Sequence, residues 1–181
     1  LRECDDIARL ERFAGGGDGV CQHRREVVPR GDLADCVQPD RRQAAGAGLR
    51  ADGGEAAYRA TDVTRAEEVK ALVALAVERF GRLDAMINNA GVAPLSRLDE
   101  GKVGEWEAMI DVNLRGVLNG IAAALPAFAE GGGHIVNVVS TAGLKIVPTM
   151  GVYAATKNAV RTLTEALRQE AQAGLRVTEI S

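Results

Sequence analysis

Four polar residues have the types and the order needed to move a proton: Asn113, Ser140, Tyr153 and Lys157. Tyr153 and Lys157 are separated by one helical turn, so on a helix their side chains can touch. An ammonium beside a phenol favours the phenolate over the neutral form. A hydroxyl such as that of Ser140 can hold a carbonyl oxygen while that oxygen is protonated. The set therefore predicts acid–base chemistry at a carbonyl or an alcohol.

Each of these features alone also has a purely structural interpretation. A tyrosine and a lysine at this spacing are usually surface neighbours on a helix. Ser140 can end a strand or cap a helix. Asn113, whose amide competes with the helix backbone, can simply face solvent. Residues 88–91, Asn-Asn-Ala-Gly, can form a turn because asparagine and glycine tolerate positive φ.

Strand and helix patterns alternate downstream of Gly53. Residues 64–67 have the form of a capping box, and the helix that they begin carries apolar residues at spacings of three and four up to Gly81, which should end it. We predict strands at residues 55–60, 83–87, 134–139 and 176–180, and further helices at residues 105–125 and 152–173.

This alternation predicts an α/β fold built from right-handed βαβ units around a parallel sheet. Ligands of such sheets bind beyond the carboxyl ends of the strands. Residues 88–91 and Ser140 both follow predicted strands. The candidate chemistry therefore converges on one edge of the sheet.

Together these residues resemble one family, the classical group of the short-chain dehydrogenases/reductases. The resemblance covers residues 52–181 and implies a Rossmann-like, doubly wound parallel sheet, incomplete at both ends, in a domain of residues 49–181. The matching motifs are Thr61-Asp62-Val63, Arg82-Leu83-Asp84, Asn88-Asn89-Ala90-Gly91, Asn113, Gly133-His134-Ile135-Val136-Asn137, Ser140 and Tyr153-Ala154-Ala155-Thr156-Lys157.

The resemblance implies a catalytic role for four residues. Tyr153 would be the acid/base, and Lys157 would favour its phenolate and bind the ribose of the nicotinamide. Both side chains would therefore also contact the cofactor. Ser140 would hold the substrate oxygen. Asn113 would bend its helix locally and hold a water molecule that links Lys157 to solvent.

The resemblance also implies a cofactor cleft. Asp62 and Val63 would contact the adenine, through a side chain and the backbone respectively. Asn89, Ala90 and Gly91 would line the cleft, with the glycine allowing close approach of the backbone. The cofactor would be NAD or NADP.

The implied reaction passes a hydride between the nicotinamide and the carbon of a secondary alcohol, giving a ketone, while Tyr153 transfers the alcohol proton. Residues 106–113 and 167–170 resemble members that act on short hydroxy acids, hydroxy-amino acids or simple ketones. Family members usually pair long helices to form homodimers or homotetramers, so we expect the same of this chain.

The glycine loop of the family, Thr-Gly-x-x-x-Gly-x-Gly, has its best counterpart at residues 14–21. Gly15 and Gly19 match, whereas Ala14 replaces the threonine and Cys21 the last glycine. The loop normally presents backbone N–H groups to the cofactor phosphates. We therefore expect weak or absent cofactor binding by this chain.

Residues 1–48 form an atypical segment that does not match the family. Arginine outnumbers lysine 18 to 4 in the chain, which is typical of a GC-rich gene. We hypothesise that this segment is an out-of-frame translation. Coding DNA in which neither alternative frame encodes a strand and a glycine loop would exclude this. The family continues past Ser181 with substrate-covering segments, so we also expect that cover to be missing.

The composition sets broader limits. With 181 residues, of which 46% are apolar, the chain is long enough for one domain with a core. A net charge of −3 does not favour nucleic acid or an anionic membrane, and no apolar stretch approaches a membrane span. Three cysteines and two isolated histidines predict neither disulfides nor a metal site. We expect a cytoplasmic protein.

Two alternatives to the enzyme remain open. The chain can be an inactive fragment of such an enzyme that is unable to fold alone. It can also be a nucleotide-binding or interaction module that uses the cleft at residues 88–91 without catalysis.

Overall fold

The computed structural model describes residues 55–128, 132–171 and 173–181. Within them, a three-stranded sheet has the order β1 (Ala85–Asn88), β2 (His134–Val138) and β3 (Arg176–Ile180). Both strand pairs are parallel, with Met86 opposite Ile135 and Ile135 opposite Val177. The predicted parallel sheet is thereby confirmed.

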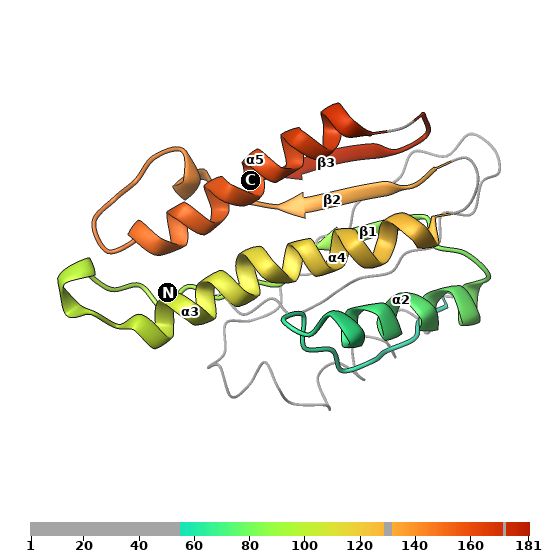
Figure 1. Cartoon of the computed structure of the whole chain (residues 1–181), viewed down its shortest axis with the longest axis horizontal. Coiled ribbons are helices and arrows are strands. Elements are labelled where there is room, and N and C mark those ends of the chain that lie inside the picture. The colour runs from blue at the N-terminus through green and yellow to red at the C-terminus, as the bar shows by residue number, and fades with distance from the viewer. Residues whose placement is uncertain (1–54, 129–131, 172) are drawn as a thin grey trace.

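Helices precede and connect these strands as βαβ units require. Four segments of the described residues are α-helical, α2 (Ala66–Phe80), α3 (Val103–Ile110), α4 (Gly116–Ala124) and α5 (Gly151–Glu170), and η3 (Asp111–Arg115) is π-helical. Short 3-10 turns form η2 (Leu98–Glu100), η4 (Leu125–Ala127) and η5 (Thr141–Gly143). Figure 1 shows α4 and α5 over one face of the sheet, with α2 beside α4.

The apolar face of α2 follows the predicted spacing with one exception. Val69, Leu72 and Val73 are buried, whereas Val77 is 38% exposed. Gly81 ends the helix as predicted. Its φ of 80° is left-handed, and its N–H donates to the carbonyl oxygen of Val77 at 2.8 Å.

The predicted capping box at residues 64–67 is wrong. Arg65 is the N-cap and makes no capping hydrogen bond through its side chain. The carboxylate of Asp62 instead accepts the backbone N–H of Thr64 at 2.9 Å and its hydroxyl at 2.8 Å, and Glu68 accepts the Asp62 N–H at 2.8 Å. An ionised carboxylate in an Asx turn accepts hydrogen bonds more strongly than a threonine hydroxyl.

The predicted strand at residues 55–60 is also wrong, since these residues have no regular secondary structure. Most of them are exposed, and none pairs with β1, β2 or β3. A strand forms only where a neighbouring strand supplies hydrogen-bond partners, and a short local pattern cannot specify that neighbour.

The predicted helix at residues 105–125 is longer and less regular than expected. It spans Val103–Ala127, is π-helical in the middle, and ends in a 3-10 turn that contains Pro126. By its length and its mean hydropathy of 1.2, this helix is long and apolar enough to cross a membrane. The expectation that no apolar stretch of the sequence approaches the length of a membrane span is therefore wrong as far as length and composition are concerned. In the structure, 39% of this window is buried inside the protein.

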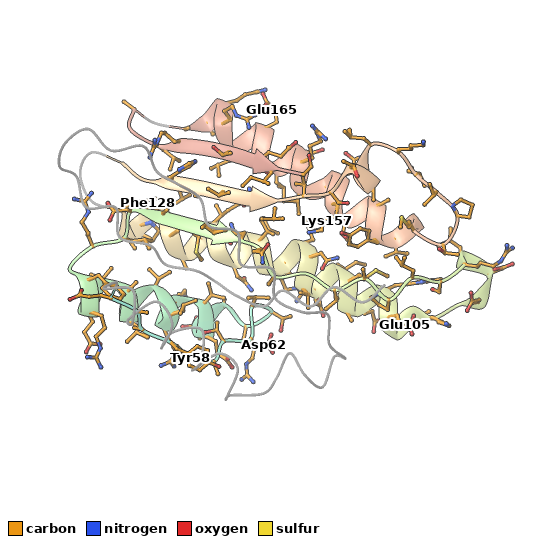
Figure 2. All side chains as sticks on the ribbon, turned by 180° about the vertical axis from the view of Figure 1, so that it is seen from behind. Tyr58, Asp62, Glu105, Phe128, Lys157 and Glu165 are labelled. Atoms are coloured by element: carbon orange, nitrogen blue, oxygen red, sulfur yellow. The ribbon has the colours of Figure 1, made fainter. Side chains whose placement is uncertain are left out.

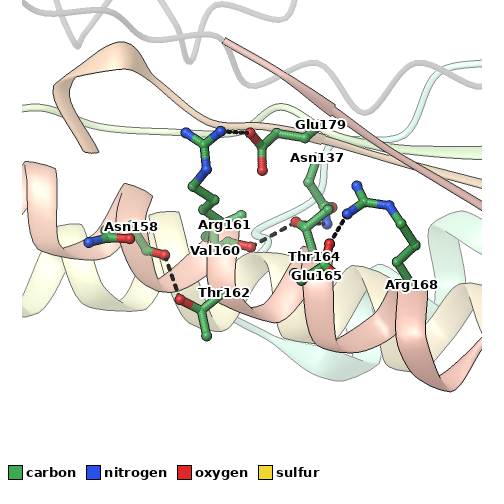
Figure 3. A network of polar contacts seen from close by, with 9 residues as sticks. All are labelled: Asn137, Asn158, Val160, Arg161, Thr162, Thr164, Glu165, Arg168 and Glu179. Atoms are coloured by element: carbon green, nitrogen blue, oxygen red, sulfur yellow. Dashed lines mark hydrogen bonds and ion pairs between the residues drawn. The ribbon is translucent and has the colours of Figure 1, made fainter. Parts of the chain in front are cut away.

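The main apolar core lies where α2 and α4 meet the sheet. Its buried members are Val69, Val73, Ala76, Leu83, Met86, Ala123, Ala124 and Ile135. The interface between the sheet and α5 is polar. There the amide of Asn88 donates to the side-chain oxygen of Asn137 at 2.8 Å, and Asn137 donates to the hydroxyl of Thr164 at 2.9 Å. Figure 3 shows Asn137 facing Thr164, and an ion pair between Arg161 and Glu179 joins α5 to β3.

Gly120 lets α4 approach this polar chain, so Gly120→Ala should destabilise the protein. A β-carbon there would overlap the side-chain oxygen of Asn88 and lie 3.2 Å from the Met86 methyl group. Overpacking of this kind costs about 1–3 kcal/mol. Gly104→Ala is the control, because that exposed helical glycine has open space around it, and should raise stability by up to about 1 kcal/mol. Urea unfolding of both variants checks this, and equal shifts would contradict it.

His134 should make the protein less stable in mild acid. Burial first, and then the charge of Arg176, lower the pKa of His134 below its ordinary value. The unfolded chain therefore binds a proton first as the pH falls through about 6.5, and stability declines until the folded histidine is also protonated. His134→Gln should remove this decline, whereas His23→Gln serves as the matched control. Unfolding midpoints between pH 8 and pH 5 measure the difference, and an equal loss of slope in both variants would refute the assignment.

Candidate active site

Tyr153 and Lys157 lie in the first turns of α5, with Lys157 nearly buried at 6% exposed. Its ammonium nitrogen is 5.9 Å from the centre of the Tyr153 ring. The same nitrogen donates to the carbonyl oxygen of Val138, the last residue of β2, at 2.9 Å. Figure 2 shows Lys157 between α5 and the helix that contains α3 and α4. The predicted pair is thus brought together at the carboxyl end of a strand.

Asn113 is completely buried, in the π-helical segment η3. Its side-chain oxygen accepts the N–H of Val92 at 2.8 Å, and its amide donates to the Val92 carbonyl at 2.9 Å. The amide also donates to the hydroxyl of Thr156 at 3.2 Å. The side chain therefore joins the loop after β1 to α5, at a point where the helix is π-helical.

Gly91 lies against both Asn113 and Lys157. A β-carbon at Gly91 would be 3.4 Å from the side-chain oxygen of Asn113 and 3.5 Å from the ammonium nitrogen of Lys157. Since glycine has no side chain, the backbone at residue 91 can approach both side chains closely. The end of β1, the π-helical segment and α5 consequently meet at one point.

Ser140 follows β2 and caps η5. Its hydroxyl oxygen accepts the N–H of Ala142 at 3.1 Å. A β-carbon at Gly143 would come within 3.2 Å of the backbone nitrogen of Asn158, so this turn packs directly on α5. The turn that carries Ser140 therefore rests on the helix that carries Tyr153 and Lys157.

A pocket lies beside residues 88–90, next to the site formed by Asn113, Ser140, Tyr153 and Lys157. It is lined by Thr61, Val63, Val69, Leu72, Met86, Ile87, Asn88, Asn89, Ala90, Gly116, Val117 and Gly120. Three predicted cofactor residues, Val63, Asn89 and Ala90, are among these. The Val63 carbonyl accepts the amide of Asn119 at 2.8 Å, which fixes this wall to α4.

The other predicted cofactor residues lie elsewhere. The Asp62 carboxylate hydrogen-bonds to Thr64 at the start of α2 and does not line the pocket. Gly15 and Gly19 lie outside the described residues. Among the residues that the structure describes, no group of three or more His, Cys, Asp or Glu side chains could hold a metal ion.

Sequence reasoning missed three contributors to this arrangement. The Val138 carbonyl and the Val92 backbone have no side-chain signature, because any residue supplies them. Thr156 lies inside the Tyr153–Lys157 motif, and its hydroxyl donates to the Tyr153 carbonyl at 2.7 Å. Its position three residues after Tyr153 is the signal that could have identified it.

Comparisons with known proteins identify the family to which this chain belongs. A family model described as short chain dehydrogenase matches residues 33–181, a stretch that begins upstream of the expected domain start at residue 49. An uncharacterized oxidoreductase of Listeria monocytogenes is 52% identical over 135 residues, covering 74% of this chain and 54% of that protein. The chain spans about half the length of the curated relatives that it matches.

Solved structures show the same fold. A short-chain dehydrogenase/reductase from Burkholderia phymatum, in complex with NAD, has a TM-score of 0.76 and 34% identity over 79% of this chain and 53% of that one. A gluconate 5-dehydrogenase from Burkholderia cenocepacia, in complex with NADP and tartrate, has a TM-score of 0.70 and 33% identity over 75% and 54%. The parallel sheet is therefore Rossmann-like, and the chain belongs to the short-chain dehydrogenase family.

Proposed function

We propose that the protein is an NAD(P)-dependent oxidoreductase that interconverts a secondary alcohol and a ketone, with Tyr153 as the acid/base. The observation that carries this proposal is the nearly buried ammonium of Lys157, 5.9 Å from the centre of the Tyr153 ring and next to Gly91. The relatives named as oxidoreductases support the reaction class.

Two features of α5 place positive charge near Tyr153. The ammonium nitrogen of Lys157 is 5.9 Å from the centre of the Tyr153 ring. Tyr153 is also in the first turn of a 20-residue helix, whose N-terminal end carries a partial positive charge. In the direction of alcohol oxidation, Tyr153 therefore accepts the hydroxyl proton, and in the reverse direction it returns that proton to the carbonyl oxygen.

Ser140 is suited to orient the substrate oxygen. Its hydroxyl oxygen already accepts the Ala142 N–H at 3.1 Å. A hydroxyl that accepts from the backbone keeps its own proton for donation. Ser140 can therefore donate to the carbonyl oxygen of a ketone and stabilise the negative charge that develops there.

The described residues fit the two ends of a nicotinamide dinucleotide. Val63 and Ala90 give the pocket an apolar wall, and Asn89 adds an amide, which suits a flat heteroaromatic ring such as adenine. Lys157, whose ammonium lies beside Gly91, is the proposed donor to the ribose hydroxyls. When bound, NAD or NADP takes up or supplies the hydride at the alcohol carbon.

Asn113 is proposed to support proton exchange with solvent. Its side-chain oxygen and the Lys157 ammonium border the same space at Gly91, at 3.4 Å and 3.5 Å from the point that a β-carbon there would occupy. A water molecule hydrogen-bonded to both groups is the proposed link to solvent. Such a water would carry a proton out of the site during alcohol oxidation and into it during ketone reduction.

The substrate class that we propose is a small polar secondary alcohol or its ketone. The sequence resembles members that act on short hydroxy acids, hydroxy-amino acids and simple ketones. Structural neighbours named gluconate 5-dehydrogenase and xylitol dehydrogenase add sugar acids and polyols to the panel that should be assayed.

Assembly into a homodimer or homotetramer in the cytoplasm completes the proposal. The helix from α3 to α4 exposes large apolar side chains that are suited to pairing with a second copy, namely Val103, Ile110, Leu118 and Leu125. A monomeric mass in sedimentation equilibrium would contradict the assembly.

Tyr153→Phe should strongly lower turnover and leave the affinity for the cofactor as it is in the wild-type protein. Phenylalanine keeps the ring but cannot transfer a proton, and losses of about 10²- to 10⁴-fold in kcat are typical of such groups. The chain offers a matched control, because Tyr58 is its other tyrosine and is exposed. Tyr58→Phe should retain full activity. Turnover that survives in Tyr153→Phe would refute the assigned role.

Titration with NADH and NADPH separates the proposed enzyme from its alternatives. Binding without turnover on any alcohol or ketone of the panel would favour a nucleotide-binding module. Absence of binding, together with strong binding of the dye ANS and loss of near-UV circular dichroism, would favour a fragment that does not fold alone.

A further inference from the structure

Thr156 forms a junction between the candidate active site and the helix opposite it. The side chain is nearly buried, at 3% exposed. Its hydroxyl donates to the carbonyl oxygen of Tyr153 at 2.7 Å and accepts the amide of Asn113 at 3.2 Å. Asn113 is in turn hydrogen-bonded to both backbone groups of Val92. One continuous chain of hydrogen bonds thus runs from the loop after β1 to the first turn of α5.

The first turn of α5 depends on such a junction because its own start is weakly held. The N-cap residue, Met150, makes no capping hydrogen bond through its side chain. The residue before it, Thr149, is β-branched and has a φ of 73°, in the left-handed region that favours glycine. A helix start without a cap frays readily, and Tyr153 is only three residues into the helix.

We propose that Thr156 is a positioning residue for Tyr153, which fixes the first turn of α5 against the π-helical segment that carries Asn113. Lys157, the residue after Thr156, donates a hydrogen bond to the Val138 carbonyl and so ties α5 to β2. Tyr153 is thereby held from two sides, with Thr156 tying its turn to the helix and Lys157 tying it to the sheet. The link to catalysis rests on the proposed function, whereas the positional claim does not.

The chain contains an internal structural match for Thr156. Thr164, also in α5 and also buried, donates to the Val160 carbonyl at 2.7 Å and accepts the amide of the buried Asn137 at 2.9 Å. It repeats the hydrogen bonding of Thr156 at a distance of two helical turns from it. Thr162, which is exposed and donates to the Asn158 carbonyl at 3.2 Å, supplies a second comparison (Figure 3).

The test compares three substitutions of threonine by valine, which keep the shape and remove the hydroxyl. Protein labelled with carbon-13 at the ring Cζ of tyrosine gives two resonances, because the chain has two tyrosines, and Tyr58→Phe assigns them. Thr156→Val should move or broaden the Tyr153 resonance and leave that of Tyr58 in place. Thr164→Val should lower the urea midpoint as much but leave the Tyr153 resonance unchanged. Thr162→Val should change neither.

Kinetics supply the second measurement. Thr156→Val should lower kcat by about tenfold or more with little change in KM, since a small misplacement of a catalytic group slows chemistry without weakening binding. Thr156→Ser, which restores the hydroxyl, should recover both the resonance and kcat. If wild-type protein shows no turnover, the proposed function fails, and the resonances still decide the position of Tyr153.

Two results would overturn the proposal. One is a Tyr153 resonance that Thr156→Val leaves unchanged. The other is a Thr164→Val variant that moves this resonance equally, because both threonines would then act only through the general packing of α5. If Thr156→Val does not fold, Thr156→Ala, which also removes the hydroxyl, replaces it, and a Tyr153 resonance that Thr156→Ala leaves unchanged would overturn the proposal.

Discussion

A lysine ammonium can lie inside a protein only where oxygen atoms replace its hydration shell. Lys157 is nearly buried, and the last carbonyl of β2, that of Val138, accepts one of its N–H groups. This requirement constrains where α5 lies on the sheet, because the helix must bring the ammonium to the end of a strand. The same placement carries Tyr153 to that edge, and Gly91 lies beside the ammonium. The location of the candidate site follows from the solvation of one buried charge.

Hydrogen bonds between buried amides and hydroxyls set the register between the helices and the sheet. Apolar packing holds α2 and α4 on β1, but it tolerates sliding because it has no directional contacts. The hydrogen bonds that link Asn88 to Asn137 and Asn137 to Thr164 are directional. An incorrect register would leave these buried polar groups without partners. Gly120 admits this chain of hydrogen bonds under α4. The polar layer thus gives the fold the precision that the site requires.

The sequence predicts those parts of the fold that follow from local patterns. The apolar spacing of α2, the left-handed Gly81 and the β-branched run of β2 are each encoded within a few residues. The strand predicted at residues 55–60 is wrong because a strand depends on a neighbouring strand that is distant in the sequence, which a local pattern does not encode. The same division applies to the site. Side chains such as Lys157 are visible in a motif, whereas the backbone groups of Val138 and Val92 that hold the site together are not.

The π-helical segment aligns three buried residues of one long helix. Met109, Asn113 and Val117 are buried at successive intervals of four residues. In an α-helix each such interval turns the side chain about 40° past the previous one, so the three side chains would spread over about 80° of the helix face. The wider turn of η3, which spans Asp111–Arg115, counteracts this drift and narrows the spread. Asn113 can therefore bind the Val92 backbone while α4 still packs Val117 and Gly120 against the sheet. An unfavourable residue in the middle of a helix is in this way compatible with a continuous core on both sides of it.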